Sequence, residues 1–176
     1  MHIPTNVVDD EYRSAVISND WVYRYWLSRR WDVGLPFITY VMLNPSSADA
    51  LVDDRTVQSC RRIAKSNGYG GFNVVNLYAW RATDREDLRK AILCPMTDEI
   101  GPENDRWIAM GMRDVDKMVC AWGSTKWATK RGLQVAREVL VPGDLWCLGT
   151  TKDGHPRHPL YLRGDTPLER WPPPAV

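Results

Sequence analysis

Short apolar segments alternate with helically spaced ones along most of the chain. Four segments of strand length are rich in apolar, β-prone residues and predict the core strands: 36–43, 71–78, 116–122 and 144–148. The segments between them predict helices at 53–67, 83–92, 102–112 and about 125–140, by helical spacing of apolar residues in the first and by signals of a helix start at Thr83 and Pro102 in the next two. Strands that alternate with helices pair mainly in parallel, through right-handed crossovers. The pattern therefore predicts an α/β fold.

A further strand is predicted before this series. Residues 21–31 (WVYRYWLSRRW) mix aromatic residues with arginines, and Asp32-Val33-Gly34 suits a turn into the strand at 36–43, so the two segments predict a hairpin. Because residues 36–43 lack polar alternation, we expect that strand to be covered on both faces. The predicted fold is a three-layer α/β/α sandwich. It has a mainly parallel four-stranded central sheet and an N-terminal antiparallel hairpin strand.

Length and composition narrow the class of protein. The 176 residues suit one domain, expected over residues 1–170, followed by an extended Pro-rich tail at 171–176. The formal net charge is +1, so nucleic-acid binding would depend on a local basic patch in a cleft. No apolar run approaches the roughly 20 residues that cross a bilayer, and the N-terminus is polar and acidic. We therefore expect a cytoplasmic protein without a membrane partner.

Metal and nucleotide motifs are missing from the sequence. The four cysteines form no CxxC pair, and we expect neither a metal nor a cofactor. The sequence contains no GxxxxGK[ST] loop, no GxGxxG and no GxSxG, which leaves a P-loop, a Rossmann site and a nucleophile elbow without support.

The ends of the predicted strands hold the most unusual sequences. In open parallel sheets, ligands bind beyond the carboxyl ends of the strands. That rule selects residues 44–47, 76–83, 123–125 and 149–162. Asn44 precedes Pro45 and Ser46 at the first strand tip, where its amide is suited either to a turn or to holding water or substrate. Asn76, near the second strand end, either pairs with backbone or reads a base, since it offers a donor beside an acceptor.

Charged residues extend the candidate site. Arg81 is expected to contact either a phosphate or the surface acid Asp84. Residues 149–162 suit an anionic ligand, although a solvated connecting loop would have a similar composition. This segment and its flank contribute His155, His158, Lys152, Arg157, Tyr161 and Arg163.

Three acidic residues follow the first strand: Asp49, Asp53 and Asp54. Three carboxylates in six residues are compatible with a divalent cation, but capping of the next helix is the expected role. If Asp49 points into the cleft, it becomes a candidate general base and Asn44 its orienting partner.

Several motifs occur together and in order: LNPSSAD, VVNLYAWRATD, GPEND, AWG and TKDGHPRHPLYL. Over about residues 23–162 they resemble an uncharacterised family of bacterial and phage proteins. More remotely, the layout resembles the uracil-DNA glycosylase superfamily. Its members have a four-stranded parallel sheet between helices, an Asp or Asn beside a proline after the first strand, and a His-Pro motif after the fourth. Asn44-Pro45 is similar to the first motif, and either His155-Pro156 or His158-Pro159 is similar to the last.

The resemblance implies hydrolysis of an N-glycosidic bond to a flipped base. It implies that Asn44 positions water, that Asn76 reads the base, and that His155 or His158 stabilises the departing base. Lys152 and Arg157 would hold the DNA backbone, and Leu160 or Tyr161 would wedge into the base stack. The stacking aromatic residue is one of three: Tyr78, Trp80 or Phe72.

The predicted function is therefore that of a DNA glycosylase-like hydrolase acting on an unusual or modified base in DNA. Two alternatives stay open: an enzyme that modifies a free nucleotide or base in the same pocket, and a non-catalytic module that binds nucleic acid or protein.

Overall fold

The computed structural model describes residues 5–8, 11–140 and 144–173. Its strands form one mixed sheet in the order β1-β2-β3-β5-β4-β6-β7-β8. In chain order the strands are β1 (Thr5–Val8), β2 (Glu11–Ile17), β3 (Arg24–Arg30), β4 (Phe37–Met42), β5 (Gly71–Asn76), β6 (Lys117–Cys120), β7 (Leu145–Cys147) and β8 (Glu169–Arg170). The chain is mixed α/β, as the sequence pattern predicts.

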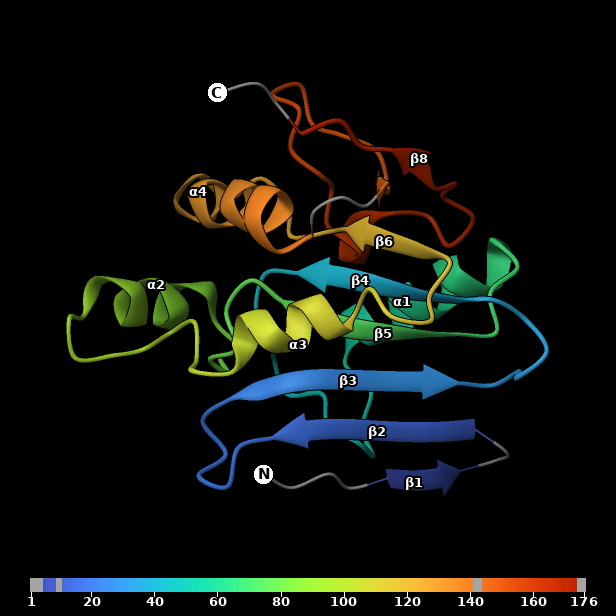
Figure 1. Cartoon of the computed structure of the whole chain (residues 1–176), viewed down its shortest axis with the longest axis horizontal. Coiled ribbons are helices and arrows are strands. Elements are labelled where there is room, and N and C mark those ends of the chain that lie inside the picture. The colour runs from blue at the N-terminus through green and yellow to red at the C-terminus, as the bar shows by residue number, and fades with distance from the viewer. Residues whose placement is uncertain (1–4, 9–10, 141–143, 174–176) are drawn as a thin grey trace.

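Helices lie on both faces of the sheet (Figure 1). The α-helices are α1 (Arg55–Ser66), α2 (Arg85–Leu93), α3 (Asn104–Met110) and α4 (Lys126–Gln134). A π-helical turn, η1 (Val135–Val139), continues α4, and a short 3-10 turn, η2 (Pro159–Tyr161), follows β7. One buried cluster lies between the sheet and α1, and a second lies on the opposite face beside α3 and α4. These layers match the predicted helices on either side of a central sheet.

The four predicted core strands are all present and adjacent. Strands β5, β4, β6 and β7 pair with one another in parallel. Every residue of β5 is buried, and in β4 only Phe37 is partly exposed. Burial on both faces explains why these two sequences lack polar alternation. Because they are parallel, their carboxyl ends share one edge of the molecule, which the arrowheads of β4 and β6 place on the left-hand side of Figure 1.

The predicted hairpin between residues 21–31 and 36–43 is wrong. Strand β3 pairs antiparallel with β5, and β4 lies beyond β5 with parallel strands on both sides. The turn itself forms, because the backbone N–H of Gly34 donates to the Asp32 side chain at 2.8 Å. A local turn signal does not set strand pairing, and the nearly all-apolar β4 takes a central place where both faces are buried.

The ends of the chain extend the sheet beyond the predicted strands. Strands β1 and β2 form a hairpin, β2 pairs with β3, and β8 pairs antiparallel with β7. Trp171 was placed in the tail by the sequence, but it is 2% exposed and packs edge-on against Trp122. The packed structure therefore continues past residue 170. The end of the predicted tail, 174–176, lies outside the described residues.

The predicted helices are present, with changes at their ends. Asp54 caps α1 by accepting from the Val57 N–H at 2.8 Å, in agreement with the expected capping by Asp53 or Asp54. The expected cap of α2 by Thr83 is wrong, because Asp84 accepts from the Glu86 N–H instead. Helix α3 begins at Asn104, two residues after Pro102, and ends at Met110 rather than Met112.

Candidate functional site

A groove crosses the edge to which the carboxyl ends of the parallel strands point. It consists of three adjoining hollows of about 380, 240 and 440 Å³. All four predicted strand-end segments contribute to the two smaller hollows. The 380 Å³ hollow is lined by Asn44, Ser46, Ser47, Ala82, Thr83 and His158, and the 240 Å³ hollow by Gly123, Ser124, Thr125, Thr151 and Arg157. The four segments that the strand-end rule selects therefore meet at one groove.

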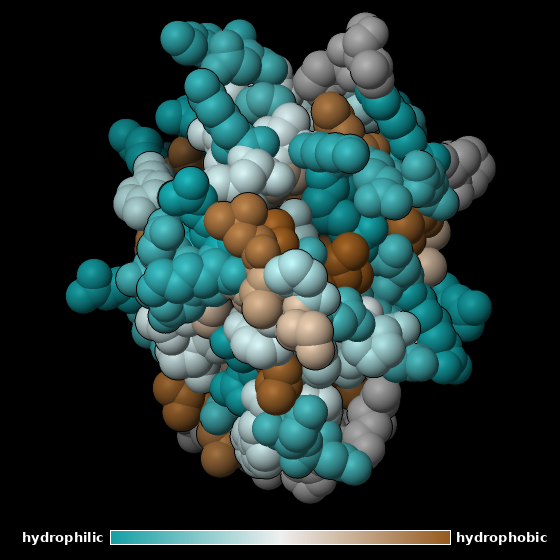
Figure 2. Space-filling model, turned by 90° about the vertical axis from the view of Figure 1, so that its left-hand side faces the viewer, coloured by the Kyte–Doolittle hydropathy of each residue, from teal (hydrophilic) through white to brown (hydrophobic). Residues whose placement is uncertain are grey.

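Tyr161 stands in the middle of the groove. Its side chain lines all three hollows and is 76% exposed. Leu160 lines two of the hollows beside it. Large aromatic side chains are normally buried, so an exposed tyrosine that borders all three hollows is available to contact a ligand. Figure 2 shows this side of the molecule as mainly hydrophilic, with hydrophobic residues gathered near its middle.

Asn44 is held in one orientation at the tip of β4. Its Nδ2 donates to the carbonyl oxygens of Pro45 at 3.0 Å and Ala82 at 2.8 Å. Since two carbonyl oxygens can be matched only by the amide nitrogen, the amide oxygen is fixed as well. Among the described residues that oxygen has no hydrogen-bond donor, although Asn44 lines the 380 Å³ hollow. Asn44 thus serves the turn through its nitrogen and offers an acceptor to the groove.

His158 lies between two of the hollows and lines both. Burial of its ring, with a further contribution from the Arg85 charge, lowers its pKa from 6.5 to about 4. Its Nδ1 accepts the backbone N–H of Leu160 at 3.3 Å, so it caps the turn η2. The neutral imidazole must then carry its proton on Nε2, which makes that atom a hydrogen-bond donor at neutral pH.

The lowered pKa of His158 predicts a loss of stability in mild acid. The unfolded chain binds a proton at His158 near pH 6.5, and the folded chain binds it only near pH 4. Stability therefore falls as the pH falls through this window, by up to about 3 kcal/mol. Urea unfolding between pH 4 and pH 8 should show a steeper slope in the wild type than in His158→Asn, which keeps an acceptor for the Leu160 N–H. The slope that remains in the variant comes from carboxyl groups with lowered pKa, such as that of Asp53. Equal slopes in both proteins would contradict the assignment.

His155 lies apart from the groove. Its backbone N–H donates to the Thr151 hydroxyl at 3.3 Å, and its carbonyl accepts the Thr151 N–H, which closes a turn. Its ring lines none of the three hollows. Of the two predicted histidines, the structure brings only His158 to the site.

Four arginines surround the groove without an acidic partner among the described residues: Arg55, Arg62, Arg85 and Arg157. The sequence prediction included only Arg157. Arg55 and Arg85 are the first residues of α1 and α2, where a cation opposes the helix dipole. The signal that could have identified them is an arginine directly after the N-cap residue. Such an arginine does not stabilise the helix, so its presence there indicates another role.

Asn76 is fully buried at the end of β5 and does not line the groove. Both of its side-chain amide atoms lack a hydrogen-bond partner among the described residues. Its carbonyl accepts from the Asn104 amide at 2.9 Å. An unpaired buried amide costs free energy, which distinguishes Asn76 from a satisfied core residue.

The remaining predicted site residues lie outside the groove. Tyr78 is buried against Trp127, Trp80 packs edge-on against Tyr23, and Phe72 is in the core beside Tyr40. Arg81 donates to the Trp21 carbonyl and not to Asp84. Lys152 lies in the exposed turn before His155. Arg163 pairs with Asp165, and Pro45, next to Asn44 in the chain, is buried. None of these side chains lines a groove hollow.

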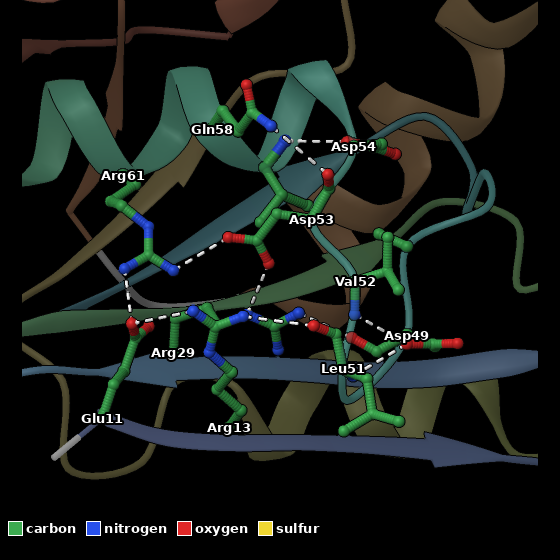
Figure 3. A network of polar contacts seen from close by, with 12 residues as sticks. Glu11, Arg13, Arg29, Asp49, Leu51, Val52, Asp53, Asp54, Gln58 and Arg61 are labelled. Carbon is green, nitrogen blue, oxygen red and sulfur yellow. Dashed lines mark hydrogen bonds and ion pairs between the residues drawn. The ribbon is translucent and has the colours of Figure 1, made fainter. Parts of the chain in front are cut away.

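The acidic residues brace the segment after Asn44 (Figure 3). Asp49 accepts the N–H groups of Leu51 at 2.8 Å and Val52 at 2.9 Å, and it does not line the groove. Asp53 pairs with Arg29 and Arg61, both at 2.8 Å. These contacts give the carboxylates structural partners. The described residues contain no group of three or more metal-ligating side chains. The structure thus supplies no contact that would make Asp49 a general base.

A β-bulge adds a second brace under the same segment. Val16 pairs with Trp26 and Ile17 with Arg24, so Tyr25 is the extra residue of β3. The bulge shifts the alternation and turns Arg24 to the α1 face. There Arg24 is 2% exposed and donates to the Ala48 carbonyl. Two buried arginines, Arg24 and Arg29, therefore hold residues 48–53 in place beside the groove.

Comparison with known proteins gives a family and no activity. A family model described as "Protein of unknown function (DUF1643)" matches residues 24–160. This confirms the predicted uncharacterised family and nearly the predicted span. No curated protein and no solved structure matches the chain, so the likeness to the uracil-DNA glycosylase superfamily stays a prediction. No helix among the described residues is long and apolar enough to span a membrane.

Proposed function

The chain belongs to the DUF1643 family, and we propose that it is a DNA glycosylase-like hydrolase that cleaves the N-glycosidic bond of an unusual or modified base. One observation carries the proposal. His158, a neutral histidine, and Asn44, whose amide oxygen has no donor among the described residues, line the same hollow at the carboxyl ends of the parallel strands. The remote resemblance of the Asn-Pro and His-Pro motifs to the uracil-DNA glycosylase superfamily points to the same chemistry.

The two side chains suit the two halves of this reaction. The bond from C1′ of the sugar to the base breaks, and the base leaves with the bonding electrons. The Nε2–H of His158 donates to the developing anion, and a neutral imidazole does so without becoming a general acid. Water adds its oxygen to C1′, and the proton that it loses reaches the released base anion through solvent, so the products are the neutral base and an abasic sugar. The Asn44 oxygen orients this water by accepting a hydrogen bond, since an amide is no base at neutral pH.

The surroundings of the hollow favour a polymer over a free nucleotide. Arg55 and Arg62 line one of the hollows that Tyr161 borders, and Arg85 and Arg157 line another. Phosphates of a strand that runs along the groove would find an arginine both before and after the hollow. Exposed Tyr161 is placed to fill the gap that a flipped base leaves in the stack.

An oligonucleotide panel tests the proposal. The purified protein is incubated with labelled DNA carrying uracil, hydroxymethylated, deaminated or mismatched bases, and abasic sites are revealed by alkali. We expect cleavage of at least one substrate, with loss of cleavage in Asn44→Ala. Binding without cleavage on any substrate would favour the non-catalytic module. Activity confined to free nucleotides would favour the nucleotide-modifying enzyme.

Salt dependence tests the role of the arginines separately. Each phosphate contact contributes about 0.7 to 0.9 to the slope of log affinity against log salt. Arg85→Ala and Arg157→Ala are each expected to lower that slope by about one and to weaken all sequences alike. Arg163→Ala is the matched control, because Arg163 lies outside the groove and pairs with Asp165. Equal slopes in Arg85→Ala and wild type would remove Arg85 from the interface.

A further inference from the structure

A second cavity, of about 560 Å³, lies at the opposite end of the parallel strands, on the face of the sheet that carries α3. Its walls come from β2, β3, the start of β4, and the segment after α3. In Figure 1 the helix α3 crosses in front of β5, and among the described residues no helix lies in front of β2. The cavity occupies this uncovered part of the sheet and shares no residue with the groove.

Its floor is a row of small polar residues across neighbouring strands. Ser14 pairs with Ser28, Ser28 with Asn73, and Asn73 with Thr39. The Asn73 Nδ2 donates to the Thr39 hydroxyl at 3.3 Å. Asn73 also lines the cavity, so its amide presents polar atoms beside the two serine hydroxyls. Exposure to solvent explains why these residues are polar. It does not explain why they are small, because larger polar side chains would suit an exposed sheet face equally well.

Along the strand direction, the polar row is followed at each end by a row that contains large side chains. On one side Trp26 pairs with Val16, and on the other Tyr12, Arg30, Gly71 and Phe37 form the next lateral row. Trp26 and Arg30 are four residues apart on β3, which separates the two rows by about 13 Å. The cavity is therefore a slot with small polar groups at its base and flat side chains at its two ends.

Glycine at position 71 shapes one of these ends. A Cβ atom there would come within 2.1 Å of the Phe37 ring. Without it, the ring lies across β5, and the Arg30 guanidinium stacks over that ring at 5.4 Å from its centroid. The Arg30 Nε is buried and has no hydrogen-bond partner among the described residues. The wall thus offers a flat aromatic surface together with a cationic guanidinium, one nitrogen of which donates to the Val33 carbonyl at 3.3 Å.

The segment after α3 adds charge and backbone strain. Arg113 lines the cavity, is exposed, and has no acidic partner among the described residues. Asp114, its neighbour in the lining, has φ of 56°, which is uncommon for a residue other than glycine. A left-handed residue costs free energy, and such residues concentrate where a particular loop geometry serves binding.

We infer that this slot binds a nucleotide, a planar heterocycle that carries a phosphate. The heterocycle would lie between the aromatic rows, with its polar edge on Asn73 and the serine hydroxyls, because an amide pairs with a donor and an acceptor side by side. The phosphate would meet Arg113 and Arg30 at the rim. This site is independent of the proposed glycosylase chemistry.

Calorimetric titration tests the inference, with nucleoside 5′-monophosphates, the parent nucleosides and inorganic phosphate as probes. We expect saturable binding of at least one monophosphate, and at least about tenfold weaker binding of its nucleoside and of phosphate alone. Arg113→Glu, which reverses an exposed charge, and Ser28→Trp, which fills the slot, should each weaken binding by about tenfold or more. Lys130→Glu, an exposed reversal on α4, is the matched control.

His158→Ala separates this site from the groove. Monophosphate affinity should be unchanged in that variant. The inference is overturned if no monophosphate binds, if binding persists unchanged in Arg113→Glu, or if binding is lost in His158→Ala, which would place the nucleotide in the groove. Thermal melting of each variant checks that the loss of binding is not a loss of fold.

Discussion

His158→Ala is expected to lower base excision by about 100-fold or more under single-turnover conditions. One preorganised hydrogen-bond donor to a developing anion is worth about that factor. His158 is the only described histidine that lines the groove, and its lowered pKa keeps it neutral and donating from Nε2 at pH 7. The measurement is the rate of abasic-site formation at saturating enzyme on the best substrate of the panel.

His155→Ala is the matched control for that experiment. Both histidines precede a proline and lie three residues apart in sequence, yet His155 closes a turn and lines no groove hollow. We expect His155→Ala to keep excision within about twofold of wild type, in the range of a variant that makes no transition-state contact. If the two variants lose activity equally, the assignment of His158 as the donor is wrong.

Arg29→Ala is expected to destabilise the fold by about 3 kcal/mol. Arg29 is fully buried, and its guanidinium bonds to Asp53 and to the carbonyls of Ser28 and Asp49. Truncation leaves a partly buried carboxylate and two carbonyls without their donors, and removing one partner of a buried pair costs several kcal/mol. Urea unfolding of the two proteins gives the difference directly.

Arg61→Ala provides the comparison for Arg29→Ala, because it removes a less deeply buried partner of Asp53. Arg61 binds the same carboxylate from α1, and that of Glu11 as well, but is 19% exposed, so water replaces part of what it contributes. We expect a loss of about 1 kcal/mol, in the range of partly exposed pairs. A loss at Arg61 equal to that at Arg29 would mean that burial does not set the energetic difference between the two arginines.

The parallel core could be predicted because its signals are local and repeated. The runs that became β4, β5 and β6 are apolar without alternation, and helically spaced residues such as Val57, Cys60 and Ile63 mark the crossover. Strand pairing could not be predicted from the Asp32–Gly34 turn. Which strand lies beside β3 depends on burial of the whole sheet, and that is not a property of any short segment.

The edge of the sheet at which the candidate site lies was easier to predict than the residues that line it. A chain-topology rule identified the four strand-end segments, whereas the choice between His155 and His158 depends on how residues 150–161 fold. Sequence reasoning favoured unusual residues such as Trp80 and Arg81, which pack against Tyr23 and Trp21. It missed Arg55 and Arg85 because arginine at a helix start looks ordinary until the helix dipole is considered.

The most direct test of the account follows the oxygen of water. The substrate panel is incubated with the protein in ¹⁸O-labelled water, and the released base, sugar and phosphate fragments are analysed by mass spectrometry. Hydrolysis at C1′ predicts a free base without ¹⁸O and strands whose phosphates are unlabelled. Label in the base would indicate deamination or another base modification, label in a phosphate would indicate strand cleavage, and either result would contradict glycosylase chemistry.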